Sequence, residues 1–168
     1  ATLGDFPVKV DPNPQLLAEW EERDLVRQRW IIDVQPYLSA TMLVNLPKGL
    51  GAKEQRPAIL CCHGHGPYGK EPVMGNQTTS ALRQEIADYG YNYLHATMFG
   101  MTSLSINVAH GKVATDVIST FPNVDSERLG VMGLSGGGTM TLWMTLCDER
   151  IKASEIICYS DLWWAFGM

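Results

Sequence analysis

The pattern of apolar and polar positions changes about a third of the way along the chain. Before residue 57, two β-like runs cover 26–34 and 37–46 and are separated by Gln35-Pro36, which predicts a hairpin at the edge of a sheet. A helix is expected to start at Asn13-Pro14, with Asn as the N-cap and Pro at the first helical position. The segment 47–56 is rich in glycine and charge and predicts a surface loop.

From residue 57 onward the apolar runs are short and continuous, which is typical of strands buried on both faces of a parallel sheet. The expected strands are 57–62, 129–133 and 151–159, the expected helices are 79–89, 104–121 and 139–147, and a polar turn is expected at 123–128. Strands that alternate with helices predict parallel βαβ units. We therefore expect an α/β fold: a mostly parallel central sheet flanked by helices on both faces, with antiparallel strands at the N-terminus.

The length of 168 residues is consistent with one domain. It would consist of an N-terminal helix and hairpin over 1–56 and a core over 57–168. A net charge of -5 disfavours nucleic acid as a partner, and no apolar run approaches the length of a membrane span. Four cysteines are too few for a disulfide scaffold and favour a reducing, cytoplasmic compartment. The sequence predicts no oligomeric state.

The stretch Gly133-Leu134-Ser135-Gly136-Gly137 fits the pattern Gly-x-Ser-x-Gly between a predicted strand and a predicted helix. A nucleophile at such a junction occupies a sharp turn, so Gly133 and Gly137 have to be small. The turn exposes the hydroxyl of Ser135, and the N–H of Gly136 can donate to an oxyanion. An ordinary glycine-rich turn is the alternative, whereas the pattern of a phosphate-binding loop is absent from the sequence.

The second motif, His63-Gly64-His65-Gly66, directly follows the predicted strand 57–62. Its glycines let the chain pass close to a substrate carbonyl, and the N–H of His65 is the candidate for the second oxyanion donor. His63 is expected to be a hydrogen-bonded structural residue rather than the base. A zinc site formed with Cys61 and Cys62 is the competing interpretation, but no distant ligand pair completes it, so we expect no metal and no cofactor.

Together these motifs and their surroundings, residues 57–75 and 125–159, resemble the α/β-hydrolase superfamily, nearest its dienelactone-hydrolase and acetyl-xylan-esterase-like branch. The resemblance implies that Ser135 is the nucleophile and that His65 and Gly136 donate to the oxyanion. It also implies acyl transfer from a small-molecule ester to water.

The sequence departs from this superfamily after Ser135. The superfamily places its acid and then its histidine after the nucleophile, whereas the four histidines His63, His65, His95 and His110 all precede Ser135. The expected strand between Tyr93 and Leu94 is also missing. We therefore expect a fragment or a sequence with an internal gap, in which the C-terminal part of the fold is absent. Asp161 is a candidate for the acid, and a loop aspartate is the equal alternative.

The leading hypothesis is a serine hydrolase of carboxylic esters with short acyl or acetyl groups, such as acetylated carbohydrate. The alternative is a catalytically inert binding domain with an α/β-hydrolase-like fold, because no histidine follows Ser135 in the sequence.

Overall fold

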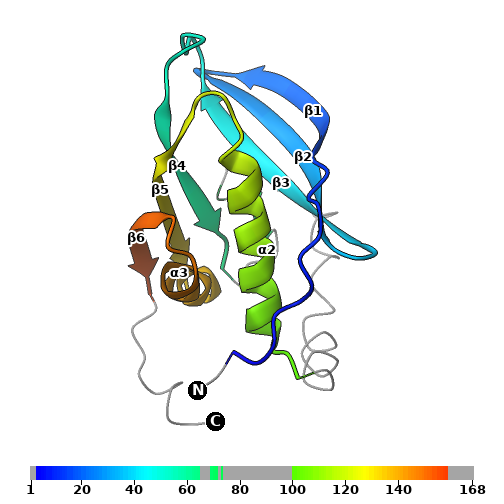
Figure 1. Ribbon diagram of the computed structural model, residues 1–168. Helices are drawn as coiled ribbons and strands as arrows, with labels where there is room; N and C mark the ends of the chain where they lie inside the picture. Colours follow the sequence, from blue (N-terminus) through cyan, green and yellow to red (C-terminus); the bar gives the residue numbers. More distant parts are fainter. Residues whose placement is uncertain (1–2, 65–68, 72, 74–99, 159–168) are drawn as a thin grey trace.

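The computed structural model describes residues 3–64, 69–71, 73 and 100–158. These residues form two three-stranded sheets and two helices (Figure 1). One sheet is antiparallel, in the order β1-β2-β3, and the other is parallel, in the order β4-β5-β6. The predicted α/β class, with antiparallel strands preceding a parallel sheet, is therefore confirmed.

The antiparallel sheet comprises β1 (Gln15–Glu22), β2 (Leu25–Gln35) and β3 (Leu38–Pro47). Tight turns connect the strands, with positive φ angles of 51° at Arg23 and 67° at Tyr37. The predicted hairpin is thus confirmed as β2 and β3. It belongs to a sheet of its own in the described chain, not to the edge of the parallel sheet.

The helix predicted from Asn13-Pro14 is wrong, because residues 15–22 form strand β1. Strand β3 pairs with one edge of β2, and β1 pairs with the other edge. This second pairing runs from Gln15, opposite Ile31, to Glu22, opposite Leu25. The side chain of Asn13 donates to the carboxylate of Asp33 across the sheet (3.4 Å) instead of capping a helix. Tertiary pairing overrides the local helix signal here.

The parallel sheet comprises β4 (Arg56–Cys62), β5 (Val124–Leu134) and β6 (Ile151–Ile157). The predicted polar turn at 123–128 is wrong in part, because β5 already begins at Val124, which pairs with Arg56. The next registered pair is Ala58 with Leu129, so residues 125–128 are accommodated as an irregularity within the strand. The three predicted strands 57–62, 129–133 and 151–159 lie within or largely overlap these elements.

Helices α2 (Ser103–Ile118) and α3 (Gly136–Cys147) confirm the two predicted helices that fall in the described chain. Val108 of α2, Val131 of β5 and Met144 of α3 form one buried cluster. A second cluster joins α2 to the antiparallel sheet through residues that include Ile32 and Val117. Helix α2 therefore lies between the two sheets (Figure 1) and fixes their relative position.

The opposite face of the parallel sheet carries exposed apolar side chains. Both described helices pack against one face of this sheet, and Ile59 on the other face is 59% exposed. The prediction that residues 57–62 are buried on both faces is therefore wrong. The helix predicted at 79–89 lies outside the described residues. None of the helices in the described ranges is long and apolar enough to cross a membrane.

Candidate active site

Ser135 lies at the junction where β5 ends and α3 begins. Its backbone angles, φ 56° and ψ -116°, are unusual for a residue with a side chain, and the residue is exposed. It occupies the N-cap position of α3, but its side chain makes no capping hydrogen bond. The hydroxyl is therefore presented to solvent on a strained turn instead of being used to stabilise the helix.

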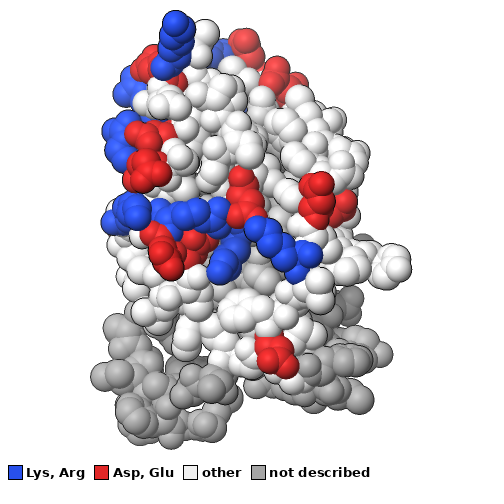
Figure 2. Space-filling view, in the orientation of Figure 1, with Lys and Arg blue, Asp and Glu red and all other residues white. Residues whose placement is uncertain are grey.

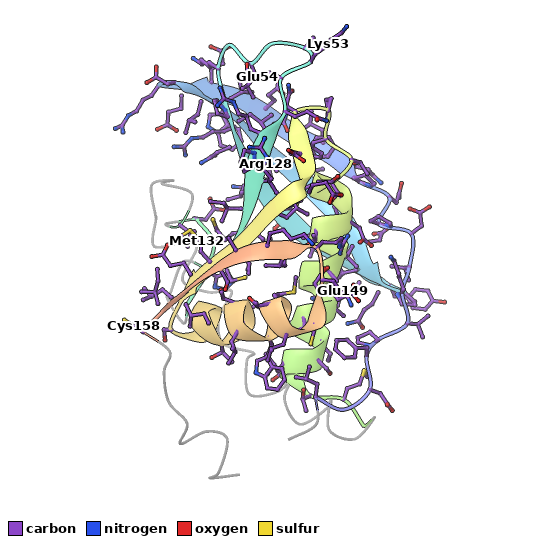
Figure 3. The ribbon with its side chains drawn as sticks, turned by 60° about the vertical axis from the view of Figure 1, so that its left-hand side comes forward. Lys53, Glu54, Arg128, Met132, Glu149 and Cys158 are labelled. Atoms are coloured by element: carbon purple, nitrogen blue, oxygen red, sulfur yellow. The ribbon has the colours of Figure 1, made fainter. Side chains whose placement is uncertain are left out.

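Backbone contacts hold this turn from both sides. The N–H of Ser135 donates to the carbonyl of Ile157 at the end of β6 (2.9 Å), and its carbonyl accepts from the N–H of Thr139 in the first turn of α3 (3.1 Å). In Figure 3, Cys158, which follows β6, lies near the end of α3 that carries this turn. The position of Ser135 is thus set by main-chain bonds to two neighbouring elements.

The glycines of the motif allow β4, β5 and α3 to approach each other closely. A Cβ atom on Gly137 would collide with the carbonyl of Cys62 and lie 2.9 Å from the carbonyl oxygen of His63. A Cβ atom on Gly133 would lie 2.7 Å from the carbonyl oxygen of Cys62. Both distances are shorter than real side chains tolerate, so these positions admit only glycine without movement of the backbone.

The loop after β4 reaches the same turn. A Cβ atom on Gly64 would lie 2.7 Å from the carbonyl oxygen of Leu134 and 3.6 Å from the Cβ of Ser135. The ring of His63 is engaged within the loop, because its Nδ1 donates to the carbonyl of Gly64 (2.9 Å). The sequence predicts two motifs 70 residues apart, and the structure brings Gly64 and Ser135 together.

Other predicted residues fall elsewhere. His65, His95, Asp161 and the junction of Tyr93 with Leu94 lie outside the described residues. His110 lies within α2, where its Nε2 is 2.9 Å from the side-chain nitrogen of Gln35, and burial lowers its pKa. Such a histidine is a neutral packing residue of the helix.

The cysteines at the end of β4 are the candidate ligands of the competing zinc interpretation. Burial, together with the neighbouring Cys61, raises the pKa of Cys62 to about 12, and a hydrogen bond with Thr141 offsets this only in part. Cys62 is therefore a thiol at neutral pH. Across the described ranges, no cluster of three or more potential ligand side chains (His, Cys, Asp or Glu) could hold a metal ion.

One buried ion pair could not be predicted from the sequence. Glu71 is buried, and its Oε1 lies 3.0 Å from Nη2 of Arg29 in β2. The two residues are 42 positions apart, and no spacing rule connects them.

On the face shown in Figure 2, positive and negative side chains are interspersed and form no large patch of one sign.

Two curated proteins are similar to this chain. An uncharacterized protein of Pseudomonas aeruginosa is 31% identical over 83% of the chain and 40% of its own length. YtaP of Bacillus subtilis, a protein assigned as a hydrolase, is 24% identical over 93% of the chain and 60% of its own length. The chain thus spans about half the length of these relatives. No protein-family model matches the sequence.

Solved structures give the fold. A protein of Bacteroides fragilis assigned as an acetyl xylan esterase has a TM-score of 0.76 at 16% identity, over 86% of this chain and 48% of that protein. A glucuronoyl esterase of Solibacter usitatus has a TM-score of 0.62 at 16% identity, over 90% of this chain and 53% of that protein. The strained serine between β5 and α3, the loop beside it and these likenesses lead to one conclusion: the chain has the fold of the α/β-hydrolases.

Proposed function

We propose that this chain carries the nucleophile of a serine hydrolase that cleaves carboxylic esters. The observation that carries the proposal is the exposed Ser135 on a strained turn, with its hydroxyl free of helix capping and the backbone of Gly64 packed against it. A positive φ at a residue other than glycine costs free energy, on the order of 1–3 kcal/mol, and such strain is concentrated at functional sites.

In the proposed reaction, Oγ of Ser135 forms a bond to the carbonyl carbon of the ester. The carbonyl oxygen becomes an oxyanion, for which the N–H groups of Gly136 and His65 are our candidate donors. The alcohol leaves with a proton as the acyl-enzyme forms, and water then attacks this intermediate, releases the acid and restores the hydroxyl.

A general base must accept the proton of Ser135. The two histidines of the described chain are engaged elsewhere, His110 with Gln35 and His63 with the carbonyl of Gly64. The superfamily that the sequence resembles places its histidine after the nucleophile, so our candidate base is a histidine from a segment outside this sequence, and Asp161 is our candidate for the acid that orients it.

The proposed substrates are short acyl esters, with acetyl groups on carbohydrate as the first to test. This proposal is supported by the similar solved structures, which include acetyl xylan and glucuronoyl esterases. The pocket that would select among esters is formed by side chains rather than by the nucleophile turn.

The first prediction concerns covalent labelling of Ser135 in the protein at its full natural length. A fluorophosphonate probe should label the protein, and Ser135→Ala should abolish labelling and lower hydrolysis of a short-chain chromogenic ester by at least about 10⁴-fold. Ser126→Ala is the matched control, because Ser126 is exposed on β5 but lies in a different part of the strand.

Labelling that persists in Ser135→Ala would remove this residue as the nucleophile. A parent protein that neither reacts with the probe nor hydrolyses esters would favour the inert binding domain instead.

A further inference from the structure

We infer that the ion pair between Arg29 and Glu71 holds residues 69–71 against the antiparallel sheet and thereby positions Gly64 beside Ser135. The inference rests on the proposed function, because it takes Ser135 as the nucleophile. We assign both charged residues a positioning role, because the proposed reaction uses neither of them as base, acid or oxyanion donor.

Arg29 provides a fixed anchor. It lies in the middle of β2, the central strand of its sheet, opposite Ala18 of β1 and Leu43 of β3. The next residue, Trp30, packs its ring against Phe121, with centroids 5.4 Å apart. A side chain that starts from this strand has little freedom to follow a moving loop.

Glu71 is the point at which the loop is attached. Only 7% of the residue is exposed, and its Oε1 lies 3.0 Å from Nη2 of Arg29. A buried carboxylate is costly without a charged or hydrogen-bonding partner, so this contact strongly favours one position of Glu71.

A short series of neighbouring groups links Glu71 to Ser135. Gly69, two residues earlier, has a φ of 53°, and a Cβ atom placed on it would lie 3.9 Å from Nε2 of His63. Nδ1 of the same ring donates to the carbonyl of Gly64 at 2.9 Å. Gly64 in turn abuts Ser135, where a Cβ atom would lie 3.6 Å from the Cβ of the serine.

This arrangement predicts a defect in chemistry rather than in substrate binding. Oxyanion donors act through their position in the transition state, and a displacement of about 1 Å can cost about 100-fold in rate. Glu71→Gln keeps the shape of the side chain but removes its charge. We expect it to lower kcat by about 10- to 100-fold and to change KM by less than about twofold.

The control must separate positioning from a general loss of stability. Asp148 is also buried and pairs with Arg150 at 2.6 Å, but it follows the C-terminal end of α3, opposite the end that carries Ser135. Asp148→Asn should lower the melting temperature and leave kcat unchanged. Arg29→Gln should lower kcat as Glu71→Gln does, and the double variant should be no worse than Glu71→Gln alone, because both changes break the same ion pair.

The outcomes distinguish this inference from the proposed function. If Ser135→Ala is inactive but Glu71→Gln retains the parent kcat, the positioning role is overturned and the nucleophile stands. Hydrogen exchange of the peptide covering residues 63–64 gives a readout that does not need activity. Exchange should accelerate in Glu71→Gln and not in Asp148→Asn, and equal exchange in the parent and Glu71→Gln would overturn the inference even in a protein that hydrolyses no ester.

Discussion

The N-termini of α2 and α3 begin with similar residues that are used in opposite ways. Thr102 caps α2 with extended backbone angles, its side chain accepts from the N–H of Ser105, and the Ser105 side chain accepts from the N–H of Thr102 in return. Ser135 caps α3 at a φ of 56° and makes no such bond. One hydroxyl stabilises its helix, whereas the other is free for chemistry.

The two helix N-termini are held in place by different kinds of contact. Helix α2 joins both sheets through buried clusters, so its capping box secures the element that holds the molecule together. Helix α3 begins instead with three glycines after a strained residue. The close contacts of Gly133 and Gly137 with β4, instead of a cap, hold this end in place.

The largest effect on stability should come from replacing the glycine that allows this contact. Gly137→Ala would drive a Cβ atom into the carbonyl of Cys62, so we expect destabilisation of about 3 kcal/mol or more, although alanine normally favours a helix. Chemical denaturation of the parent and the variant measures this difference in the free energy of unfolding. Gly51→Ala is the control, because the nearest atom there would be 3.8 Å away, and equal stability of the two variants would contradict the packing argument.

The next effect tests the two caps directly. Thr102→Ala should lower the free energy of unfolding by about 1 kcal/mol, which is roughly 2–4 °C in Tm, and leave ester hydrolysis unchanged. Ser135→Ala should change the free energy of unfolding by less than about 0.5 kcal/mol, because no capping bond is lost. A stability loss in Ser135→Ala as large as that in Thr102→Ala would remove the distinction between the two helices.

The smallest effect concerns the pH dependence of stability contributed by α2. Burial lowers the pKa of His110 below its usual 6.5, so the folded chain resists a proton that the unfolded chain takes up. The free energy of unfolding therefore does not change through His110 above pH 6.5, and it decreases as the pH falls below that value. His110→Gln should flatten the stability profile in this range, measured as Tm against pH; parallel profiles would show that His110 does not titrate differently on folding.

The sequence predicts the parallel core better than the N-terminal sheet, for a physical reason. The motif around Ser135 has a local steric cause, so its spacing alone indicates a strand, a turn and a helix. The segment 15–22 has no such constraint: Leu16, Leu17 and Trp20 satisfy a helical pattern, yet pairing with β2 makes the segment a strand. Long-range pairing of this kind leaves no trace in a local pattern.

The candidate site divides in the same way. Ser135 and Gly64 can be predicted because each belongs to a motif that the chemistry requires. The pair of Arg29 and Glu71 cannot, because it depends on how a loop lies across a sheet formed 42 residues earlier in the chain. Residues that act through other residues become visible only when the fold is known.

The close approach of Gly137 to Cys62 and of Gly64 to Ser135 has a consequence for how this protein could change. The glycine contacts that hold the turn of Ser135 are made to backbone atoms. Mutations could therefore remodel the surrounding side chains while the hydroxyl of Ser135, our proposed nucleophile, stays where it is.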